Sequence, residues 1–334
     1  MSAVKWGVIS TANIGVAKVI PGMQKSDSIE IAAISSRKQA NADDWAQRLR
    51  IPKAYGSYEE LLADPEIEAI YNPLPNHLHV PWSIKAMEAG KHVLCEKPLG
   101  VDRADAERLM AVRDATGMLI QEAFMVRTYH QWLKVKEIAD SGRIGDVRFV
   151  EARFSYFNDD PNNVRNMPDI GGGGILDIGC YPIVLSRFIY GEEPQRVVSL
   201  IDRDQRFGTD RTASALMEFS GGRQAMWMSS TQLSLSQTFI VMGTRGRIEV
   251  DIPYNPPPDA STTITIDDGR DLTGGGAEKI TLPILDQYMV QGEEFGKAIR
   301  GQRSQAIPLE SSLANMRVID ACFESEKNGG WVDI

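Results

Sequence analysis

The fold of this chain is predicted most directly from His92-Val93-Leu94-Cys95-Glu96-Lys97-Pro98, residues 92–98. The apolar run His92 to Cys95 has the length of a buried strand, and a glutamate, a lysine and a proline follow it. Open α/β sheets bind their ligands at the carboxyl ends of parallel strands. We therefore expect a parallel sheet here, with Lys97 at its ligand-binding edge.

The same alternation of strand-like and helix-like segments extends in both directions, from Lys5 to about Glu122. The other expected strands are Trp6–Ile9, Ile29–Ile34, Ala69–Tyr71 and Met118–Gln121. The expected helices begin at about Ile14 and cover Asn41–Leu49, Pro81–Ala89 and Arg103–Thr116. Such alternation is typical of βαβ units, whose helices cover both faces of a parallel sheet. Residues 1–123 are therefore predicted to form a doubly wound α/β domain.

The second half of the chain, residues 124–334, has a different pattern. After an expected bridging helix at Trp132–Asp140, strand-like runs follow one another with few helices between them: Val147–Phe154, Arg196–Leu200, Ala213–Phe219, Gln224–Ser229 and Phe239–Met242. This pattern indicates an α+β domain with an open antiparallel sheet. Helices return at Gln287–Ile299 and Leu309–Glu326, and we expect the C-terminal helix to pack back on the first domain.

The composition excludes several classes of function. A net charge of −9 and a pI near 5.1 disfavour nucleic-acid binding, which needs a basic face. The three cysteines, Cys95, Cys180 and Cys322, are widely spaced, so neither a disulfide framework nor a paired-ligand metal site is expected. No apolar run is expected to reach the ~20 residues of a membrane span, and the amino terminus lacks a signal-peptide pattern. We expect a cytoplasmic protein with a small-molecule partner.

The first strand leads into a turn at which dinucleotide-binding folds place the cofactor phosphates, formed here by Ser10, Thr11, Ala12, Asn13, Ile14 and Gly15. If Gly15 is the third glycine of a G-x-G-x-x-G fingerprint, Ser10 and Ala12 replace the first two. Small residues still let the backbone approach a pyrophosphate, and the helix amino terminus offers free N–H groups. We expect Ser10 to Ile14 to bind the cofactor; an ordinary strand-to-helix turn is the alternative.

The second strand ends in Ser35-Ser36-Arg37-Lys38. An acidic residue that would bind a ribose 2′-hydroxyl is absent there, whereas a serine and two cations suit a 2′-phosphate. Ser36, Arg37 and Lys38 therefore favour NADP, with NAD as the second choice. The alternative is that Arg37 and Lys38 only solvate the start of a helix.

A second set of polar residues lies downstream of Gly171–Gly174. If the chain is helical from Ile175, Asp177 and Tyr181 share one face, which supplies a proton donor with a charged neighbour. Taken singly, Asp177 could cap its helix, Tyr181 could be a core aromatic residue and Lys97 a surface lysine. Together they indicate proton-coupled redox chemistry.

These motifs resemble those of the glucose-fructose oxidoreductase, inositol dehydrogenase and MocA (Gfo/Idh/MocA) family. The residues that carry the resemblance are Pro75-Asn76-x-x-His79, Glu96-Lys97-Pro98, Glu122-Ala123-Phe124-Met125 and Gly172-Gly173-Gly174-x-x-Asp177-x-Gly179-x-Tyr181. The resemblance covers nearly the whole chain. It implies an N-terminal Rossmann domain, a C-terminal domain with an open antiparallel sheet and a homodimer or homotetramer that packs through this sheet.

The resemblance also implies roles for individual residues. Lys97 is expected to be the active-site lysine, Asp177 a substrate-orienting or proton-relay group, and Tyr181 the general acid/base. Tyrosine instead of histidine at that position is similar to the branch containing NADP-dependent xylose dehydrogenases and dimeric dihydrodiol dehydrogenase. The further cofactor-binding residues expected are Pro73, Leu74, Asn76, His79, Glu96, Lys97 and Glu122. Arg165 and Tyr156 are candidates for substrate contacts, with sheet-face or ion-pair roles as the alternative.

The predicted reaction is hydride transfer between NADP and a sugar or polyol carbon. Tyr181 would remove the hydroxyl proton, and Lys97 would favour the phenolate by lowering a pKa that is ordinarily near ~10. An aldose such as xylose or glucose would give a lactone. The alternatives are a keto-sugar reductase, a trans-dihydrodiol dehydrogenase and, from another class, a regulatory protein that senses NADP without turnover.

Overall fold

The computed structural model describes residues 2–334, which form two compact units. Unit 1 comprises the chain up to Thr128 together with Asp286–Leu313, and unit 2 comprises Tyr129–Leu285 together with Ala314–Ile334. The predicted division at residues 123 and 124 therefore assigned 286–313 to the other half of the protein. Periodicity in a sequence indicates a helix, but it does not indicate the sheet on which that helix packs.

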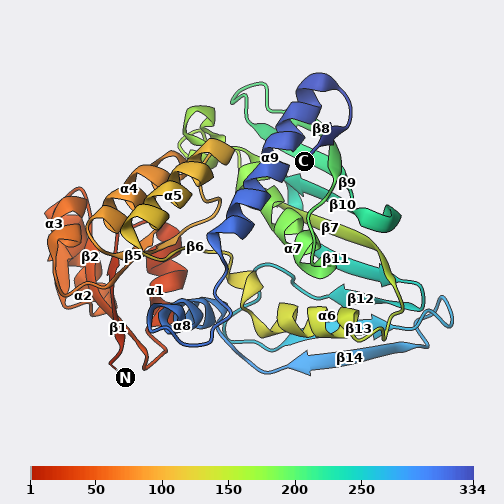
Figure 1. Ribbon diagram of the computed structural model, residues 1–334, viewed down its shortest axis with the longest axis horizontal. Coiled ribbons are helices and arrows are strands. Elements are labelled where there is room, and N and C mark those ends of the chain that lie inside the picture. The colour runs from red at the N-terminus through yellow and green to blue at the C-terminus, as the bar shows by residue number, and fades with distance from the viewer. Residues whose placement is uncertain (1) are drawn as a thin grey trace. The chain divides into compact units, whose positions relative to one another are not determined.

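Unit 1 contains a parallel sheet of six strands in the order β3-β2-β1-β4-β5-β6 (Figure 1). The strands are β1 (Val4–Val8), β2 (Ile29–Ser35), β3 (Lys53–Tyr55), β4 (Ala69–Asn72), β5 (His92–Cys95) and β6 (Ile120–Glu122). The helices are η1 (Gly15–Val19), α1 (Ile20–Met23), α2 (Gln39–Leu49), α3 (Tyr58–Ala63), α4 (Asn76–Glu88), α5 (Arg103–Thr116), η2 (Met125–Arg127) and α8 (Gln287–Ile299). The predicted doubly wound sheet is confirmed, and its strand order reverses between β1 and β4, where such folds bind ligands.

Successive residues of β1 point to opposite faces of this sheet, and helices cover each face. Trp6 is fully buried in a core that includes residues of η1, α1, α2 and α8. Gly7 faces α3 so closely that a Cβ atom there would lie 2.9 Å from the Leu61 side chain. The absence of a side chain at Gly7 therefore allows α3 to pack against the sheet.

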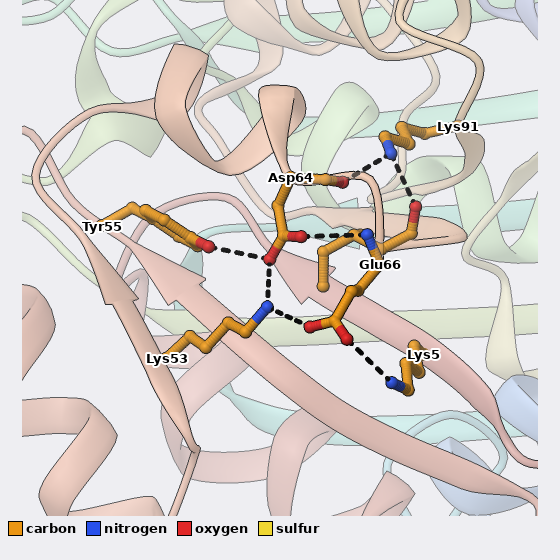
Figure 2. Close-up of polar contacts among 7 residues, drawn as sticks. Lys5, Lys53, Tyr55, Asp64, Glu66 and Lys91 are labelled. Atoms are coloured by element: carbon orange, nitrogen blue, oxygen red, sulfur yellow. Dashed lines mark hydrogen bonds and ion pairs between the residues drawn. The ribbon is translucent and has the colours of Figure 1, made fainter.

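The short elements β3 and α3 were not predicted, and a polar cluster joins them to neighbouring segments (Figure 2). The Asp64 carboxylate accepts from Lys53 Nζ and from the Tyr55 hydroxyl, each at 2.7 Å. Lys53 also contacts Glu66, and the buried ammonium of Lys91 donates to the Asp64 and Ile67 carbonyls. Because side-chain contacts hold this region, a strand of three residues persists where periodicity alone gives no signal.

Unit 2 contains a nine-stranded sheet in the order β14-β13-β12-β11-β7-β10-β9-β8-β15. Its strands are β7 (Val147–Phe157), β8 (Arg196–Arg203), β9 (Asp210–Glu218), β10 (Gln224–Ser230), β11 (Gln232–Gly243), β12 (Gly246–Val250), β13 (Thr262–Asp267), β14 (Ala277–Leu282) and β15 (Val332–Asp333). The sheet is mostly antiparallel, as expected, but β10 pairs with β7 in parallel. The predicted open antiparallel sheet is confirmed, and this one parallel pair was not predicted, because pairing between distant strands leaves no local pattern.

The helical segments of unit 2 are α6 (His130–Asp140), η3 (Val164–Asn166), η4 (Pro168–Ile170), η5 (Ile175–Gly179), α7 (Cys180–Tyr190), η6 (Ser220–Gly222) and most of α9 (Leu309–Asn328). The residues of α9 up to Leu313 belong to unit 1. In Figure 1, α6 and α7 lie over the same face of the nine-stranded sheet. Val197 of β8 and Trp227 of β10 are buried. Leu200 and Met226 point to the other face of the same two strands and are exposed. Register places Leu200, Met226 and Met242 on one common face.

One helical stretch, Pro168–Tyr190, is long and apolar enough to meet a length and composition test for a membrane span. The expectation that no apolar run reaches this length was therefore wrong. Of its most apolar window, 89% is buried inside the protein, as in the core helix of a globular fold. This stretch carries both Asp177 and Tyr181, and its apolar character is explained by its packing in unit 2.

Candidate active site

The turn after β1 has the backbone shape that a glycine usually provides. Ser10 has φ = 70°, in the left-handed region, and its hydroxyl accepts the Ala12 N–H at 3.3 Å. The helix that follows begins with N–H groups that have no partner within the helix. These donors and the small residues before them suit an anionic group such as a dinucleotide pyrophosphate. A side chain at Gly15 would make only ordinary contacts with Tyr71 and Pro73, at 3.5 Å.

The end of β2 presents two cations beside a buried serine. Ser36 is buried and its N–H donates to the Tyr55 carbonyl, whereas Arg37 and Lys38 are exposed. Both exposed side chains can direct donors to a phosphate at this end of the sheet. Contact with a cofactor stays a prediction for all three residues.

Lys97 lies in the loop after β5, and neighbouring side chains hold its backbone. The Lys97–Pro98 peptide bond is cis. Glu96 accepts the Lys97 N–H at 3.2 Å through one carboxylate oxygen and the Tyr71 hydroxyl at 2.8 Å through the other. Burial and the Glu96 charge raise the pKa of Tyr71 well above its ordinary value, which keeps Tyr71 as the donor. Glu96 thus joins the Lys97 loop to β4.

His79 and Glu122, both predicted to bind the cofactor, contact the same loop. The ring nitrogens of His79 lie 2.7 Å from the Pro98 carbonyl and 2.6 Å from the Leu74 carbonyl. Glu122 accepts the Leu99 N–H at 2.8 Å. Burial lowers the pKa of His79 to about 4, and the side chain is 1% exposed. This geometry leaves neither ring nitrogen of His79 for a ligand, so the residue supports the Leu74 and Pro98 loops.

Asn72 is a buried residue of this site that sequence reasoning missed. Its amide group donates to the His79 carbonyl at 3.0 Å and to the Ser83 hydroxyl at 3.1 Å, and its oxygen accepts the Leu74 N–H. These bonds fix the Pro73-Leu74 segment between β4 and α4, which begins at Asn76. A polar residue at the end of an apolar strand was the available signal.

In unit 2, Asp177 is paired with two of the predicted substrate-contacting side chains. Tyr156 donates its hydroxyl to Asp177 Oδ2 at 2.6 Å, and Arg165 Nε lies 2.9 Å from the same oxygen. The Asp177 charge raises the pKa of Arg165, and burial together with that charge raises the pKa of Tyr156. Asp177 is therefore a fixed carboxylate, and Tyr156 remains protonated as its donor.

Tyr181 occupies the first turn of α7, after the π-helical turn η5 that begins at Ile175. Helix from Ile175 onward is therefore confirmed, and Asp177 and Tyr181 keep their shared face. The Tyr181 ring lies 5.8 Å from that of Phe154 and 5.5 Å from that of Tyr254, and it is 4% exposed. Tyr254 was not singled out in the sequence. Lys97 belongs to unit 1 and this group to unit 2, so their joint action is a proposal.

Family models match both halves of the chain. One, described as an oxidoreductase family with an NAD-binding Rossmann fold, covers residues 4–124. Another, described as the GFO/IDH/MocA C-terminal domain, covers residues 132–249. The two matches meet the expectation of a nucleotide-binding first domain and a distinct second domain.

Individual proteins are similar over nearly the whole length. An uncharacterized oxidoreductase of Rhizobium meliloti is 46% identical over 331 residues, which is 99% of each chain. The D-xylose 1-dehydrogenase (NADP(+)) 2 of Haloferax volcanii is 36% identical over 98% of this chain and 99% of its own. A 3-ketoreductase of Actinomadura kijaniata, solved with NADP and TDP-benzene, is 29% identical with a TM-score of 0.90, covering 97% of this chain and 98% of its own.

Proposed function

The chain belongs to the Gfo/Idh/MocA family of oxidoreductases, and we propose that it transfers a hydride between NADP and a carbon of a sugar or polyol. As a member of this family it is an NAD(P)-dependent oxidoreductase. The observation that carries the substrate proposal is full-length similarity to a D-xylose 1-dehydrogenase that uses NADP. The reaction proposed first is oxidation of an aldose, such as xylose or glucose, at its anomeric carbon to a lactone.

When bound, NADP would supply the nicotinamide ring as the acceptor of the hydride that leaves the substrate carbon. Tyr181 takes the proton of the substrate hydroxyl, so that the carbon–oxygen double bond forms as the C–H bond breaks. Asp177, fixed by Tyr156 and Arg165, would orient a substrate hydroxyl. Lys97 would stabilise the phenolate and the developing charge on oxygen. The roles of Lys97 and Tyr181 rest on their two motifs and on this chemistry.

Preference for NADP is supported by Ser36, Arg37 and Lys38 at the end of β2. A hydrogen bond from arginine to a phosphate contributes about 1.5–3 kcal/mol, which is roughly tenfold or more in affinity. Arg37→Ala should therefore raise the Kd for NADP about tenfold and change that for NAD little. Arg48→Ala, which removes a surface partner of Asp44 on α2, is the matched control. Equal affinities of Arg37→Ala and the unchanged chain for NADP would contradict this assignment.

A keto-sugar reductase is the second candidate, favoured by the similarity to the 3-ketoreductase. The direction of the reaction separates the two, since a reductase consumes NADPH with a keto-sugar and gives little turnover with aldoses. The test is a near-ultraviolet assay with purified protein, NADP or NAD, and a panel of aldoses, inositols and dihydrodiols, run also in reverse with keto-sugars. Turnover with an aldose supports the first proposal, and turnover only with a dihydrodiol or keto-sugar replaces it. Binding of NADP without any turnover would indicate a regulatory protein.

We also propose that the protein acts in the cytoplasm as a homodimer or homotetramer that packs through the sheet of unit 2. The exposed apolar side chains Leu200, Met226 and Met242 on one sheet face support this contact. Light scattering should give a mass of two or four chains, and Met226→Lys should lower it. Leu272→Lys, at a fully exposed loop position, is the control. A monomeric unsubstituted protein would refute this contact.

A further inference from the structure

Asp210 is a buried carboxylate at the beginning of β9, and sequence analysis did not single it out. It is 2% exposed, and its Oδ2 accepts the backbone N–H of Ile175 at 2.6 Å. Ile175 is the first residue of η5, the turn that carries Asp177 and leads into α7. One side chain of the sheet thus binds the start of the helix that bears Asp177 and Tyr181.

The glycine run before this helix is shaped to admit the Asp210 carboxylate. Gly173 has φ = 124°, and a Cβ atom there would lie 1.9 Å from Asp210 Oδ1. Gly174 is also close, with a Cβ position 3.2 Å from the Asp210 carbonyl oxygen. On the other side, a Cβ at Gly172 would lie 2.7 Å from the Arg165 carbonyl oxygen. The glycines therefore let the turn fit between the Arg165 segment and Asp210.

The glycine turn also connects Asp210 to the Asp177 backbone and to Arg165, which binds the Asp177 carboxylate. The Gly173 N–H donates to the Arg165 carbonyl at 2.9 Å, and the Gly173 carbonyl accepts the Asp177 N–H at 3.1 Å. Arg165 in turn pairs with the Asp177 carboxylate. A shift of the turn away from Asp210 would therefore move the Asp177 backbone and its guanidinium partner together. Tyr181 lies one helical turn further along.

The environment of Asp210 is costly for a charged group. Burial raises the pKa of Asp210 to about 7, against the opposing effects of the Ile175 N–H and the Arg203 charge. The charged residues that act on it from neighbouring elements are Arg203 on β8 and Glu326 on α9, and these two also pair with each other. Burial disfavours the charge of a carboxylate, so a buried aspartate is unusual in a protein core. Such departures from ordinary core composition occur at functional sites.

We propose that Asp210 is a positioning residue for the candidate catalytic helix: its carboxylate binds the first N–H of η5, fixes the glycine turn and thereby places Asp177 and Tyr181. This inference rests on the proposed function in one respect, the assignment of Asp177 and Tyr181 to the reaction. The placement of the helix itself does not depend on that assignment.

The test is Asp210→Asn, which keeps the size of the side chain but turns one acceptor oxygen into a donor facing a backbone N–H. Hydrogen exchange, followed by mass spectrometry, should become at least about tenfold faster across residues 173–181, and kcat should fall by roughly tenfold to a hundredfold. The Kd for NADP should stay within about twofold, because unit 1 holds the nucleotide-binding turn.

Asp204→Asn is the matched control. Asp204 is also buried, and its carboxylate accepts from the Arg206 and Phe207 N–H groups and from Gln232, none of which belongs to η5. This variant should leave exchange at 173–181 and kcat unchanged. Equal losses in the two variants would show a general effect of the β8–β9 region and would overturn the proposal.

Hydrogen exchange tests the positioning role of Asp210, and turnover tests the proposed function. Faster exchange at 173–181 supports the positioning role even if no substrate is turned over, in which case the proposed function fails alone. Unchanged exchange and unchanged kcat in folded Asp210→Asn overturn the positioning role alone. Asp210→Ser, which retains one small acceptor, is measured if the asparagine variant does not fold. If neither variant folds, Asp210 supports the whole unit rather than this helix, and the proposal is overturned.

Discussion

Asp177 illustrates, at the scale of the residue, how a carboxylate acquires a fixed role. Tyr156 near the end of β7 and Arg165 in η3 both direct donors to the same Asp177 oxygen. The sequence suggested Tyr156 and Arg165 as substrate contacts, with ion-pair roles as the alternative, and the structure places both against Asp177. Two donors directed to one carboxylate oxygen hold the Asp177 side chain in one orientation. This fixed orientation supports the proposal that Asp177 orients the substrate.

Asp177→Asn should lower kcat by roughly tenfold to a hundredfold and leave the Kd for NADP unchanged, because misplaced reacting groups slow the chemical step. Tyr156→Phe should cause a smaller loss, since Arg165 still holds the carboxylate. Steady-state kinetics with the substrate identified in the panel assay measure both. Full turnover in Asp177→Asn would remove this residue from the site.

The residues proposed to carry the chemistry have clearer signals in the sequence than the residues that position them. Lys97 and Tyr181 stand out because their types and motifs indicate chemistry. Glu96, His79 and Glu122 were named as cofactor-binding residues, and the structure shows that their side chains contact the backbone of Lys97, Pro98 and Leu99. No spacing rule reveals that all of these contacts converge on the Lys97 loop.

At the scale of the element, the connection β3–α3–β4 depends on polar contacts rather than on apolar burial. Asp64 accepts from Lys53, from Tyr55 and from the Glu66 N–H (Figure 2). Burial alone would raise the pKa of Asp64, but these bonds together lower it to about 2. The folded-state value lies below the ~3.9 of an unfolded chain, so the ionised form stabilises the folded protein.

The Asp64 contribution should be fully present above about pH 4 and lost as the pH falls towards 2. Its magnitude is about 1–2 kcal/mol in the free energy of unfolding, after allowance for the half-exposed Lys53 partner. Urea unfolding of the unsubstituted chain and of Asp64→Asn, measured at pH 6 and pH 3, tests this. The stability difference between the two should shrink at the lower pH, whereas Asp44→Asn on the surface of α2 should show little difference at either. A difference that grows on acidification would contradict the assignment.

Most long elements could be predicted, because their hydrophobic periods extend over enough residues. The strand at His92–Cys95 and the helix at Arg103–Thr116 have the predicted bounds. The strand Lys53–Tyr55 was missed, since three half-buried residues carry no period. The parallel pair of β7 and β10 was also missed, because strand partners are chosen by tertiary packing.

At the scale of the whole molecule, unit 1 is completed by Asp286–Leu313, a segment that follows strand β14 of the second sheet in the chain. Phe295 of α8 is 2% exposed and packs against Trp6 of β1, with ring centroids 5.8 Å apart. Arg300, just after α8, pairs with Glu68, and Glu293 accepts from Ser26. Unit 1 therefore combines residues from two widely separated parts of the chain.

Phe295→Ala should destabilise unit 1 by about 3–5 kcal/mol, the usual loss for a buried phenylalanine. NADP binding should weaken with it, although the residue lies far from β1 in sequence. Denaturant unfolding and NADP titration of the full chain measure both effects. Phe157→Ala, at a position 65% exposed, should change neither. Stability of Phe295→Ala within about 1 kcal/mol of the unsubstituted chain would show that α8 contributes little.

The central claim, hydride transfer with Tyr181 as the acid/base, is tested most directly by Tyr181→Phe. Initial rates with NADP and the best substrate of the panel would be compared with those of Tyr190→Phe, on the same helix, whose hydroxyl donates to the Gln224 carbonyl. Loss of a general acid/base should lower kcat of Tyr181→Phe by about 10²–10⁴-fold without loss of NADP binding, and Tyr190→Phe should retain most turnover. Near-normal turnover of Tyr181→Phe would contradict the account.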